Sequence, residues 1–377
     1  MELEFTTDQE ELRDSVRAVL ARECTPAFVR GIAEKRTAGV DVDTEPLWSQ
    51  MVALGWPALT VPEAAGGLGF AAVELAVLVE ALGQSMTPGP LLPTVSQFVP
   101  AVREAGSTAQ HDTFLRPVAE SGRTGSLALD DAHGVVTVAR RQGDAWVLSG
   151  TKRLVMEAPA VDGFVVVARV SETGDADDVG AFVVPRDAPG LSVEPVRNLD
   201  PSRLLGTVVL HDVTVDASAV LGEPGPATAT AVRRAVEEAT VALALETVGT
   251  TQMIFDVTLE YAKQREQFGV PIGSFQAIKH KFADMVIAIE RARATGYFAA
   301  LTIAEDDDRR TMATSMAKAA AGDAQRMVGK EGIQIHGGIG YTWEHDIHLY
   351  VRRAKADAAL FGTATEHRAR VAALLDW

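Results

Sequence analysis

The stretch Gln334-Ile335-His336-Gly337-Gly338-Ile339-Gly340-Tyr341 lies near the end of the 377-residue chain. Three of four consecutive positions are glycine, and helical patterns flank the stretch from about residue 311 and from about residue 344. Glycine permits positive φ and a close approach of the backbone to a ligand. Backbone N–H groups at such a turn bind anions such as a pyrophosphate. The same residues also fit a glycine-capped turn between two helices, so the rest of the chain has to separate the two interpretations.

The composition is that of a globular protein, with 47% hydrophobic and 23% charged residues. We find no apolar run of about 20 residues that could span a bilayer, and the acidic N-terminus does not resemble a signal peptide. The single cysteine, Cys24, excludes an internal disulfide, and the net charge of −16 opposes binding to nucleic acid or an anionic membrane. His336, His345 and His348 lack the spacing of a zinc site. We therefore expect a cytoplasmic protein without a metal, nucleic-acid or membrane partner.

The pattern of residues predicts three domains of an α+β protein. Helical periodicity fills an N-terminal all-α domain, 1–122, and a C-terminal four-helix bundle, 227–377. Between them, at 123–226, short Val-rich segments with period two predict a small β-sandwich or barrel. Seven strands are expected, at 126–129, 135–140, 145–148, 164–170, 180–184, 192–196 and 207–215.

Together with this organisation, three motifs resemble the acyl-CoA dehydrogenase family over essentially the whole chain. One runs from Tyr261 through Arg265-Glu266-Gln267-Phe268-Gly269 to Met285, and the second is the opening stretch about 70 residues later. The third runs from Leu54-Gly55-Trp56 to Gly66-Gly67-Leu68-Gly69. The first two in register are specific, whereas either alone is moderate evidence. No strand precedes the glycines at 337–340, so they are not a dinucleotide-binding fingerprint.

The resemblance implies FAD, bound between the subunits of an oligomer. Arg265 would reach the FAD pyrophosphate from the neighbouring subunit, for which a planar guanidinium is suited. Its alternative role is a surface salt bridge. The other implied contacts are Gln267, Phe268, Phe275 and Gln276 along the cofactor, Gln334, Gly337 and Gly338 at its pyrophosphate and adenosine, and Thr363 and Thr365 at its adenine-side end.

The segments expected to face the flavin depart from the family pattern. A Thr-Glu-Pro-Gly-like segment that normally hydrogen-bonds the flavin is matched here by Ala128-Leu129-Asp130-Asp131-Ala132. A Trp-x-Thr segment that normally packs on the ring is replaced by Leu154 and Met156 at the matching positions. Backbone contacts survive such changes because they require no particular side chain, but the affinity and redox tuning of the flavin depend on them.

The positions that carry the catalytic base in the family depart further from its pattern. The family's usual glutamate falls on Phe361, and the position that a minority of members use, 26 residues before Arg265, falls on Ala239. Glu246 lies seven residues beyond Ala239, on the same helical face and about 10 Å further along. Glu246 is therefore the candidate base, since a desolvated glutamate has a raised pKa. Its alternative is a buried structural carboxylate paired with Lys or Arg.

Three functions follow from the resemblance. The first is an FAD-dependent acyl-CoA dehydrogenase that forms an α,β double bond in an acyl thioester, as a homo-oligomer, with electron-transfer flavoprotein as the expected acceptor. The second is a non-catalytic subunit that completes the FAD site of a heterotetramer with a related chain. The third is an altered flavin reaction, an oxidase or monooxygenase. The acyl group is left open.

Overall fold

The computed structural model describes residues 4–131, 136–170 and 178–376. Its N-terminal part is helical, with short 3₁₀ and π turns between the helices. The elements are α1 (Thr7–Glu23), α2 (Pro26–Thr37), α3 (Glu45–Ala53), η1 (Trp56–Ala58), η2 (Glu63–Ala65), α4 (Ala72–Gln84), α5 (Leu91–Pro93), η3 (Thr94–Phe98), α6 (Val99–Ala105), α7 (Thr108–Phe114) and α8 (Arg116–Ser121). Most of α4 is apolar and buried, which makes it the central helix of this part.

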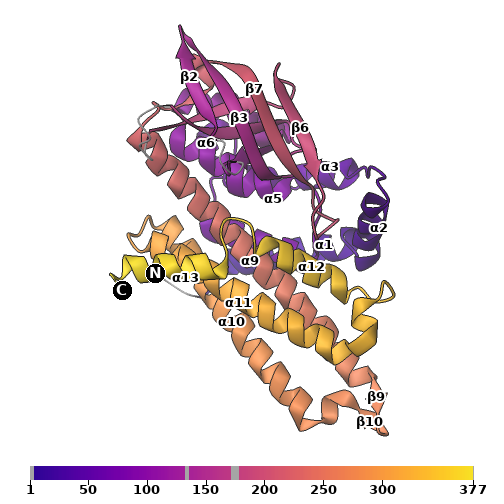
Figure 1. Ribbon diagram of the computed structural model, residues 1–377. Coiled ribbons are helices and arrows are strands. Elements are labelled where there is room, and N and C mark those ends of the chain that lie inside the picture. The colour runs from indigo at the N-terminus through magenta and orange to yellow at the C-terminus, as the bar shows by residue number, and fades with distance from the viewer. Residues whose placement is uncertain (1–3, 132–135, 171–177, 377) are drawn as a thin grey trace.

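The middle part is one mixed sheet, drawn at the top of Figure 1. Its strands are β1 (Gly125–Ala128), β2 (Val138–Gln142), β3 (Ala145–Met156), β4 (Gly163–Arg169), β5 (Val179–Pro185), β6 (Leu191–Val196), β7 (Leu205–Asp216) and β8 (Val220–Leu221). They follow the order β6-β7-β3-β2-β4-β5-β8, with β1 parallel to β4. Among the described residues, Val138 pairs with Arg169 to join β2 to β4, and a bridge between Asp131 and Lys152 links the segment after β1 to β3. The predicted strand at 135–140 corresponds to β2, and its first residue lies outside the described residues.

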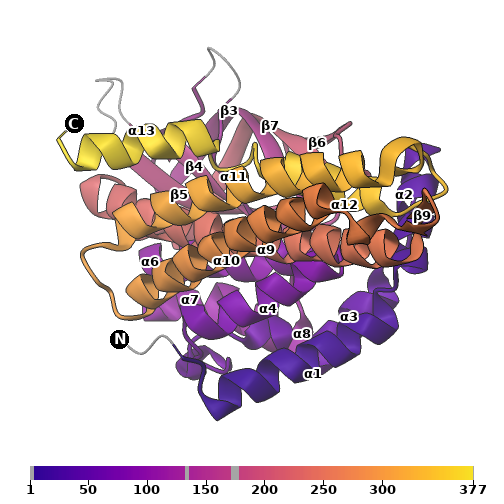
Figure 2. The same ribbon diagram turned by 90° about the horizontal axis from the view of Figure 1, so that it is seen from below.

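Three long helices form the C-terminal part, and they lie side by side in Figure 2. They are α9 (Pro226–Gln264), α10 (Gln276–Ala304) and α11 (Arg310–His336), followed by η6 (Gly337–Tyr341), α12 (Ile347–Asp357) and α13 (Ala364–Leu374). Between α9 and α10 stand the hairpin strands β9 (Glu266–Gln267) and β10 (Val270–Pro271) and the turn η5 (Ile272–Ser274). This arrangement confirms the predicted α+β class of helical, β and helical parts.

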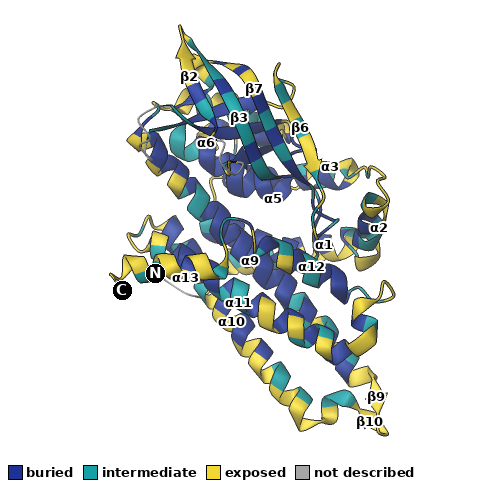
Figure 3. Cartoon of the chain, viewed as in Figure 1, coloured by how far each residue is buried: buried dark blue, intermediate teal, exposed yellow. Residues whose placement is uncertain are grey.

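The N-terminal helices and the bundle share one hydrophobic core. The closest approach is between α4 and α9, where a Cβ atom on Gly83 would lie 2.0 Å from the Glu246 carbonyl oxygen. A Cβ atom on Gly249 would likewise lie 2.0 Å from the Glu80 carbonyl oxygen. Two facing glycines therefore let the helix backbones touch, and they fix α9 against α4 (Figure 3 shows the buried middle of α9). Within the described ranges we find no helix long and apolar enough to cross a membrane.

Candidate functional site

Arg265 directly precedes β9 at the exposed tip of the bundle, and the β9–β10 hairpin lies at lower right in Figure 1. Helix α9 ends at Gln264, and Phe268 and Gly269 close the β9–β10 hairpin with φ angles of 56° and 80°. Phe268 is 94% exposed and meets the ring of Phe275 edge to face at 6.2 Å. The guanidinium of Arg265 is exposed and makes no ion pair or hydrogen bond with any described residue. The alternative role of Arg265 in a surface salt bridge is therefore not seen in the part of the chain that the structure describes.

The glycine turn η6 lies at the same end of the bundle. Helix α11 ends where Gly337 adopts φ 65°, and a Cβ atom at Gly337 or Gly338 would meet no heavy atom within 4 Å. The ring of Tyr261, one turn before Arg265, stacks on His336 with centroids 4.4 Å apart. This stack joins the end of α9 to the end of α11. The two motifs thus bring a free guanidinium and open glycine backbone to one end of the bundle, where both face solvent.

Thr363 and Thr365 lie elsewhere. Thr363 caps α13, because its hydroxyl accepts a hydrogen bond from the Glu366 N–H at 3.3 Å. The adjacent Ala364 lies against Gly322, in the middle of α11. Fourteen helical residues separate Gly322 from the end of α11, a distance of about 21 Å. One chain therefore presents the predicted cofactor residues as two groups, one at the tip and one beside the middle of α11.

The two usual base positions carry no titratable group. Phe361 is half-buried with φ 55°, an uncommon conformation for an aromatic residue, and Ala239 is buried within α9. Glu238, beside Ala239, is paired with Arg103 of α6, away from the face of α9 that carries Ala239. These contacts leave Glu246 to be considered.

Glu246 lies in a buried cluster of six charged side chains between α9, α11, α12 and the loop from β6 to β7. Its carboxylate pairs with Arg203 and with Arg353, the latter at 3.0 Å. Arg203 also pairs with Asp357, Arg353 pairs with Asp200, and the Lys318 ammonium donates to the Asp357 carbonyl oxygen at 2.7 Å. Every member is at most 5% exposed. Glu246 thus has the paired, buried environment of the structural alternative, and its role as a base remains a prediction that these contacts do not favour.

Burial sets the protonation of this cluster. Burial raises the pKa of Asp357 to about 7, with Arg203 and Arg353 opposing the shift and Glu246 and Asp200 reinforcing it. Burial lowers the pKa of Lys318 to about 8, with Asp357 and Glu246 opposing the shift and Arg203 reinforcing it. Three cations, Arg203, Lys318 and Arg353, formally balance the carboxylates of Asp200, Glu246 and Asp357. The cluster binds the β6–β7 loop to the bundle, because Asp200 and Arg203 come from that loop and their partners come from helices.

A cavity of about 540 Å³ lies where α9, α11 and α13 meet the end of β1. Its apolar wall includes Leu129, Val236 and Leu374, and the polar residues among its lining are Arg233, Glu237, Thr240, Thr311, Thr314, Ser315, His367 and Arg370. The Thr314 hydroxyl is buried and has no hydrogen-bond partner among the described residues. An apolar cavity with a few convergent polar groups is the usual form of a ligand site. The sequence reasoning missed this cavity, since its residues come from distant segments.

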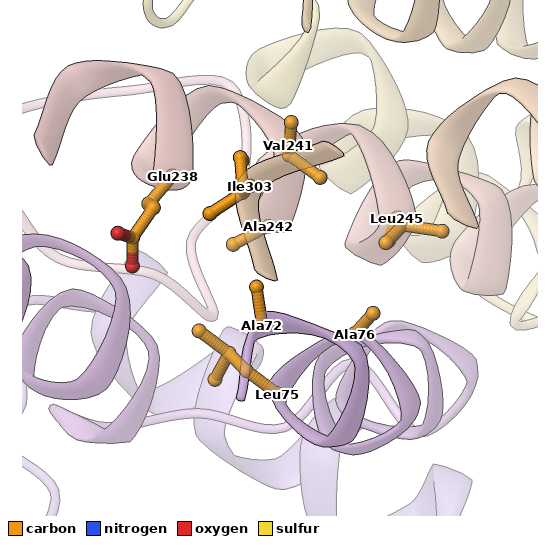
Figure 4. Close-up of a pocket in the computed structure, with 8 residues that line it drawn as sticks. All are labelled: Ala72, Leu75, Ala76, Glu238, Val241, Ala242, Leu245 and Ile303. Atoms are coloured by element: carbon orange, nitrogen blue, oxygen red, sulfur yellow. The ribbon is translucent and has the colours of Figure 1, made fainter. Parts of the chain in front are cut away.

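A second gap, between α4 and α9, is not a binding site. Figure 4 shows it lined by small aliphatic side chains from α4, α9 and α10, with Glu238 at one side. Its volume is about 10 Å³, which is at the lower limit for a single water molecule. We attribute it to packing around the helix crossing.

Comparison with known proteins agrees with the order of helical, β and helical parts. Family models match residues 6–122 (acyl-CoA dehydrogenase, N-terminal domain), 122–213 (middle domain) and 229–375 (C-terminal domain). The chain is 32% identical to acyl-CoA dehydrogenase IpdE2 of Mycobacterium tuberculosis, covering 95% of this chain and 94% of that protein. It is similar to butyryl-CoA dehydrogenase from Megasphaera elsdenii (TM-score 0.91, 26% identity, all of both chains). It is also similar to a chain of the ChsE4–ChsE5 complex of M. tuberculosis (TM-score 0.89, 26% identity, 100% and 99% covered).

Proposed function

The chain belongs to the acyl-CoA dehydrogenase family, and on this basis we propose that it is an FAD-dependent oxidoreductase that forms an α,β double bond in an acyl-CoA thioester. The observation that carries the proposal is the tip of the bundle, where unpaired Arg265 lies at the same end as the open turn at Gly337 and Gly338. A free guanidinium and exposed backbone N–H groups fit the pyrophosphate of a dinucleotide cofactor.

The residues we assign to FAD act as two half-sites. At the tip, Arg265 binds pyrophosphate oxygens and the exposed aromatic residues cover the cofactor. The tip residues are Arg265, Gln267, Phe268, Phe275, Gln276, Gln334, Gly337 and Gly338, and the second group is Thr363 and Thr365. Since the groups lie about 21 Å apart along α11, we propose that a neighbouring subunit contributes one of them to each site. When bound, FAD supplies the acceptor for the hydride that leaves the β-carbon of the substrate.

The cavity beside α13 is the proposed place of the acyl thioester. It lies against the end of β1, in the segment that the family resemblance places beside the flavin. Its apolar wall suits an acyl chain, and the unpartnered Thr314 hydroxyl offers a hydrogen bond to a polar group of the ligand. Electron-transfer flavoprotein is the proposed acceptor of the electrons.

The experiment is spectroscopic. Purified protein is expected to carry FAD and to show bleaching of the flavin band under anaerobic conditions with at least one thioester from a panel of straight, branched and ring-bearing acyl-CoAs. Arg265→Gln is expected to weaken FAD binding about 10- to 100-fold, since it removes a charge-assisted hydrogen bond to phosphate. Arg140→Gln, an exposed change on β2, serves as the control. Flavin-free protein, or wild-type affinity in Arg265→Gln, would refute the assignment.

A second candidate, the non-catalytic subunit of a heteromeric dehydrogenase, is favoured by one observation. Phe361 and Ala239 occupy the usual base positions, and Glu246 is held by two arginines. Such a subunit would hold FAD through its tip while a related partner supplies the base. A flavin-loaded homo-oligomer that bleaches with an acyl-CoA would exclude this candidate, and flavin retention only after co-expression with a related chain would support it.

A further inference from the structure

His367 and Ser315 meet across the wall of the 540 Å³ cavity. His367 is on α13 and Ser315 is on α11, and their side chains are joined by a hydrogen bond between Nδ1 and Oγ at 3.2 Å. They are 1% and 3% exposed. Figure 2 shows α13 lying along α11, which brings these residues together although 52 positions separate them in the chain.

The second ring nitrogen of His367 fixes the tautomer. Nε2 lies 2.9 Å from the Phe361 carbonyl oxygen, which only accepts hydrogen bonds, so the proton is on Nε2. Nδ1 is then the unprotonated nitrogen, and the Ser315 hydroxyl donates to it. This is the arrangement in which a histidine activates a hydroxyl, with a backbone carbonyl in the orienting position that a carboxylate often holds.

Burial keeps the ring neutral. It lowers the pKa of His367, an effect that Arg370 and Lys318 reinforce and that the Phe361 carbonyl opposes. The charged groups of the elements packed around the ring are Arg233 and Glu237 of α9, Lys318 of α11, and Glu366 and Arg370 of α13. A neutral imidazole at physiological pH has a lone pair with which to accept a proton.

The carboxylate that lines the cavity, Glu237, is an alternative proton acceptor, but it already has other partners. Glu237 accepts from Arg310 Nε and from the Thr311 hydroxyl, both at 2.6 Å, so its oxygens already have cationic and hydroxyl partners. Among the described residues that line this cavity, the His367–Ser315 pair is therefore the better-placed proton acceptor.

The pair also adjoins the position where the family resemblance places a glutamate base. A Cβ atom on Gly362, the residue after Phe361, would lie 3.0 Å from His367 Nε2. The imidazole thus packs directly beneath the Phe361–Gly362 turn, and its Ser315 partner extends the pair toward the cavity.

We propose that the Ser315–His367 pair replaces the missing glutamate and takes up the α-proton of the acyl thioester; this rests on the dehydrogenase function proposed above. The α C–H bond breaks as Ser315 Oγ takes the proton and passes its own proton to His367 Nδ1, which leaves an imidazolium. The electron pair forms the α,β double bond, and the β-hydrogen leaves with its bonding electrons to the flavin, which is the oxidant. The positive ring is stabilised by the Phe361 carbonyl, and the proton leaves to solvent after product release.

The test uses FAD-loaded protein and the acyl-CoA that bleaches it fastest. Two rates are followed against pH: solvent-deuterium exchange at the substrate α-carbon by NMR, and bleaching of the flavin. We expect His367→Gln to lower both at least about 100-fold. Gln keeps a donor for the Phe361 carbonyl, so FAD content and melting temperature should be preserved. Ser315→Ala, which removes the group that takes up the α-proton, should lower both rates by a similar factor, and His211→Gln, an exposed histidine of β7, should change neither.

Further readouts separate this role from a structural one. In wild type, exchange should fall as acid protonates the ring, and that acid limb should vanish in His367→Gln. In ¹⁵N-histidine-labelled wild-type protein, His367 should give the signal of an Nε2–H tautomer. Wild-type exchange in His367→Gln, with the acid limb intact, would overturn the inference while leaving the dehydrogenase function in place. A wild type that neither exchanges nor bleaches with any thioester would overturn both.

Discussion

Replacing Arg353 with methionine tests whether the buried charge cluster holds the β part against the bundle. Arg353 is fully buried, pairs with Asp200 and Glu246, and donates to the Ser202 hydroxyl at 2.9 Å. Methionine of similar length fills the space but leaves Asp200 without its ion-pair partner and Glu246 with Arg203 as its remaining one. Breaking a buried pair in this way costs about 3–5 kcal/mol, because desolvated charge is left uncompensated.

The expected loss in the free energy of unfolding corresponds to a lower melting temperature. At about 2.1 cal/mol/K per residue, a chain of 377 residues has an unfolding entropy of about 0.8 kcal/mol/K, so a loss of about 4 kcal/mol lowers Tm by about 5 °C. Differential scanning calorimetry and urea unfolding followed by circular dichroism both measure it. Arg352→Met, the same change on the preceding residue, is the control. Its guanidinium lies over the ring of Trp343, a contact worth about 0.5–1 kcal/mol.

A compensating change separates charge from packing. Adding Asp200→Asn to Arg353→Met restores formal neutrality, and Asn keeps an oxygen for the Ser202 N–H. We expect the double variant to regain about 1–3 kcal/mol relative to the sum of the single changes. Equal stability of Arg353→Met and Arg352→Met, or strict additivity in the double variant, would refute the claim that Arg353 neutralises this cluster.

Two further predictions concern other parts of the fold. Burial and Arg352 lower the pKa of His348 to about 4, so between pH 6.5 and 4 the unfolded chain binds a proton that the folded ring does not. The free energy of unfolding should therefore fall by up to about 3 kcal/mol as the pH is lowered through that window, as measured by urea titrations at stepped pH. His348→Phe should remove most of this pH dependence without losing a hydrogen bond, since neither ring nitrogen has a partner among the described residues. An unchanged pH dependence in His348→Phe would contradict the prediction. Gly249→Ala should lower the free energy of unfolding by about 3 kcal/mol or more, because its Cβ would meet the Glu80 carbonyl oxygen. Gly31→Ala in α2, where a Cβ meets no atom, should raise it by about 0.5–1 kcal/mol. Similar effects in the two variants would show that helix propensity, and not the contact between α4 and α9, determines the stability change.

The sequence predicted that Arg265 and the glycines of η6 stand at helix ends, because both features are local; their contacts with FAD stay a prediction. Arg265 and Phe268 are three residues apart, and the glycines of η6 stand together, so the motifs themselves placed these groups at helix ends. The exposure of the Phe268 ring also follows from its place in a two-strand hairpin that extends beyond the bundle.

The interior could not be predicted in the same way. Glu246 was singled out by its helical face, but its partners Arg203 and Arg353 lie 43 and 107 positions away, and no spacing rule connects them. His367 was not predicted for the same reason. Its hydrogen-bond partners are Ser315, on another helix, and the Phe361 backbone carbonyl, and no sequence pattern indicates either contact. Pairings that depend on how three helices pack become visible only in the assembled structure.

The positions of the two half-sites also bear on the choice between a homo-oligomer and a mixed one. The tip carries the residues suited to phosphate, and it lies about 21 Å along α11 from Thr363. The tip can therefore bind the FAD pyrophosphate even in a chain whose own cavity does not bind or oxidise an acyl thioester. A homo-oligomer needs both half-sites of every chain to work, and it then needs a proton acceptor, which the Ser315–His367 pair would supply. A mixed oligomer with a glutamate-bearing partner needs only the tip. Loss of turnover in His367→Gln with full FAD binding therefore argues for the first arrangement, whereas loss of turnover only in Arg265→Gln argues for the second.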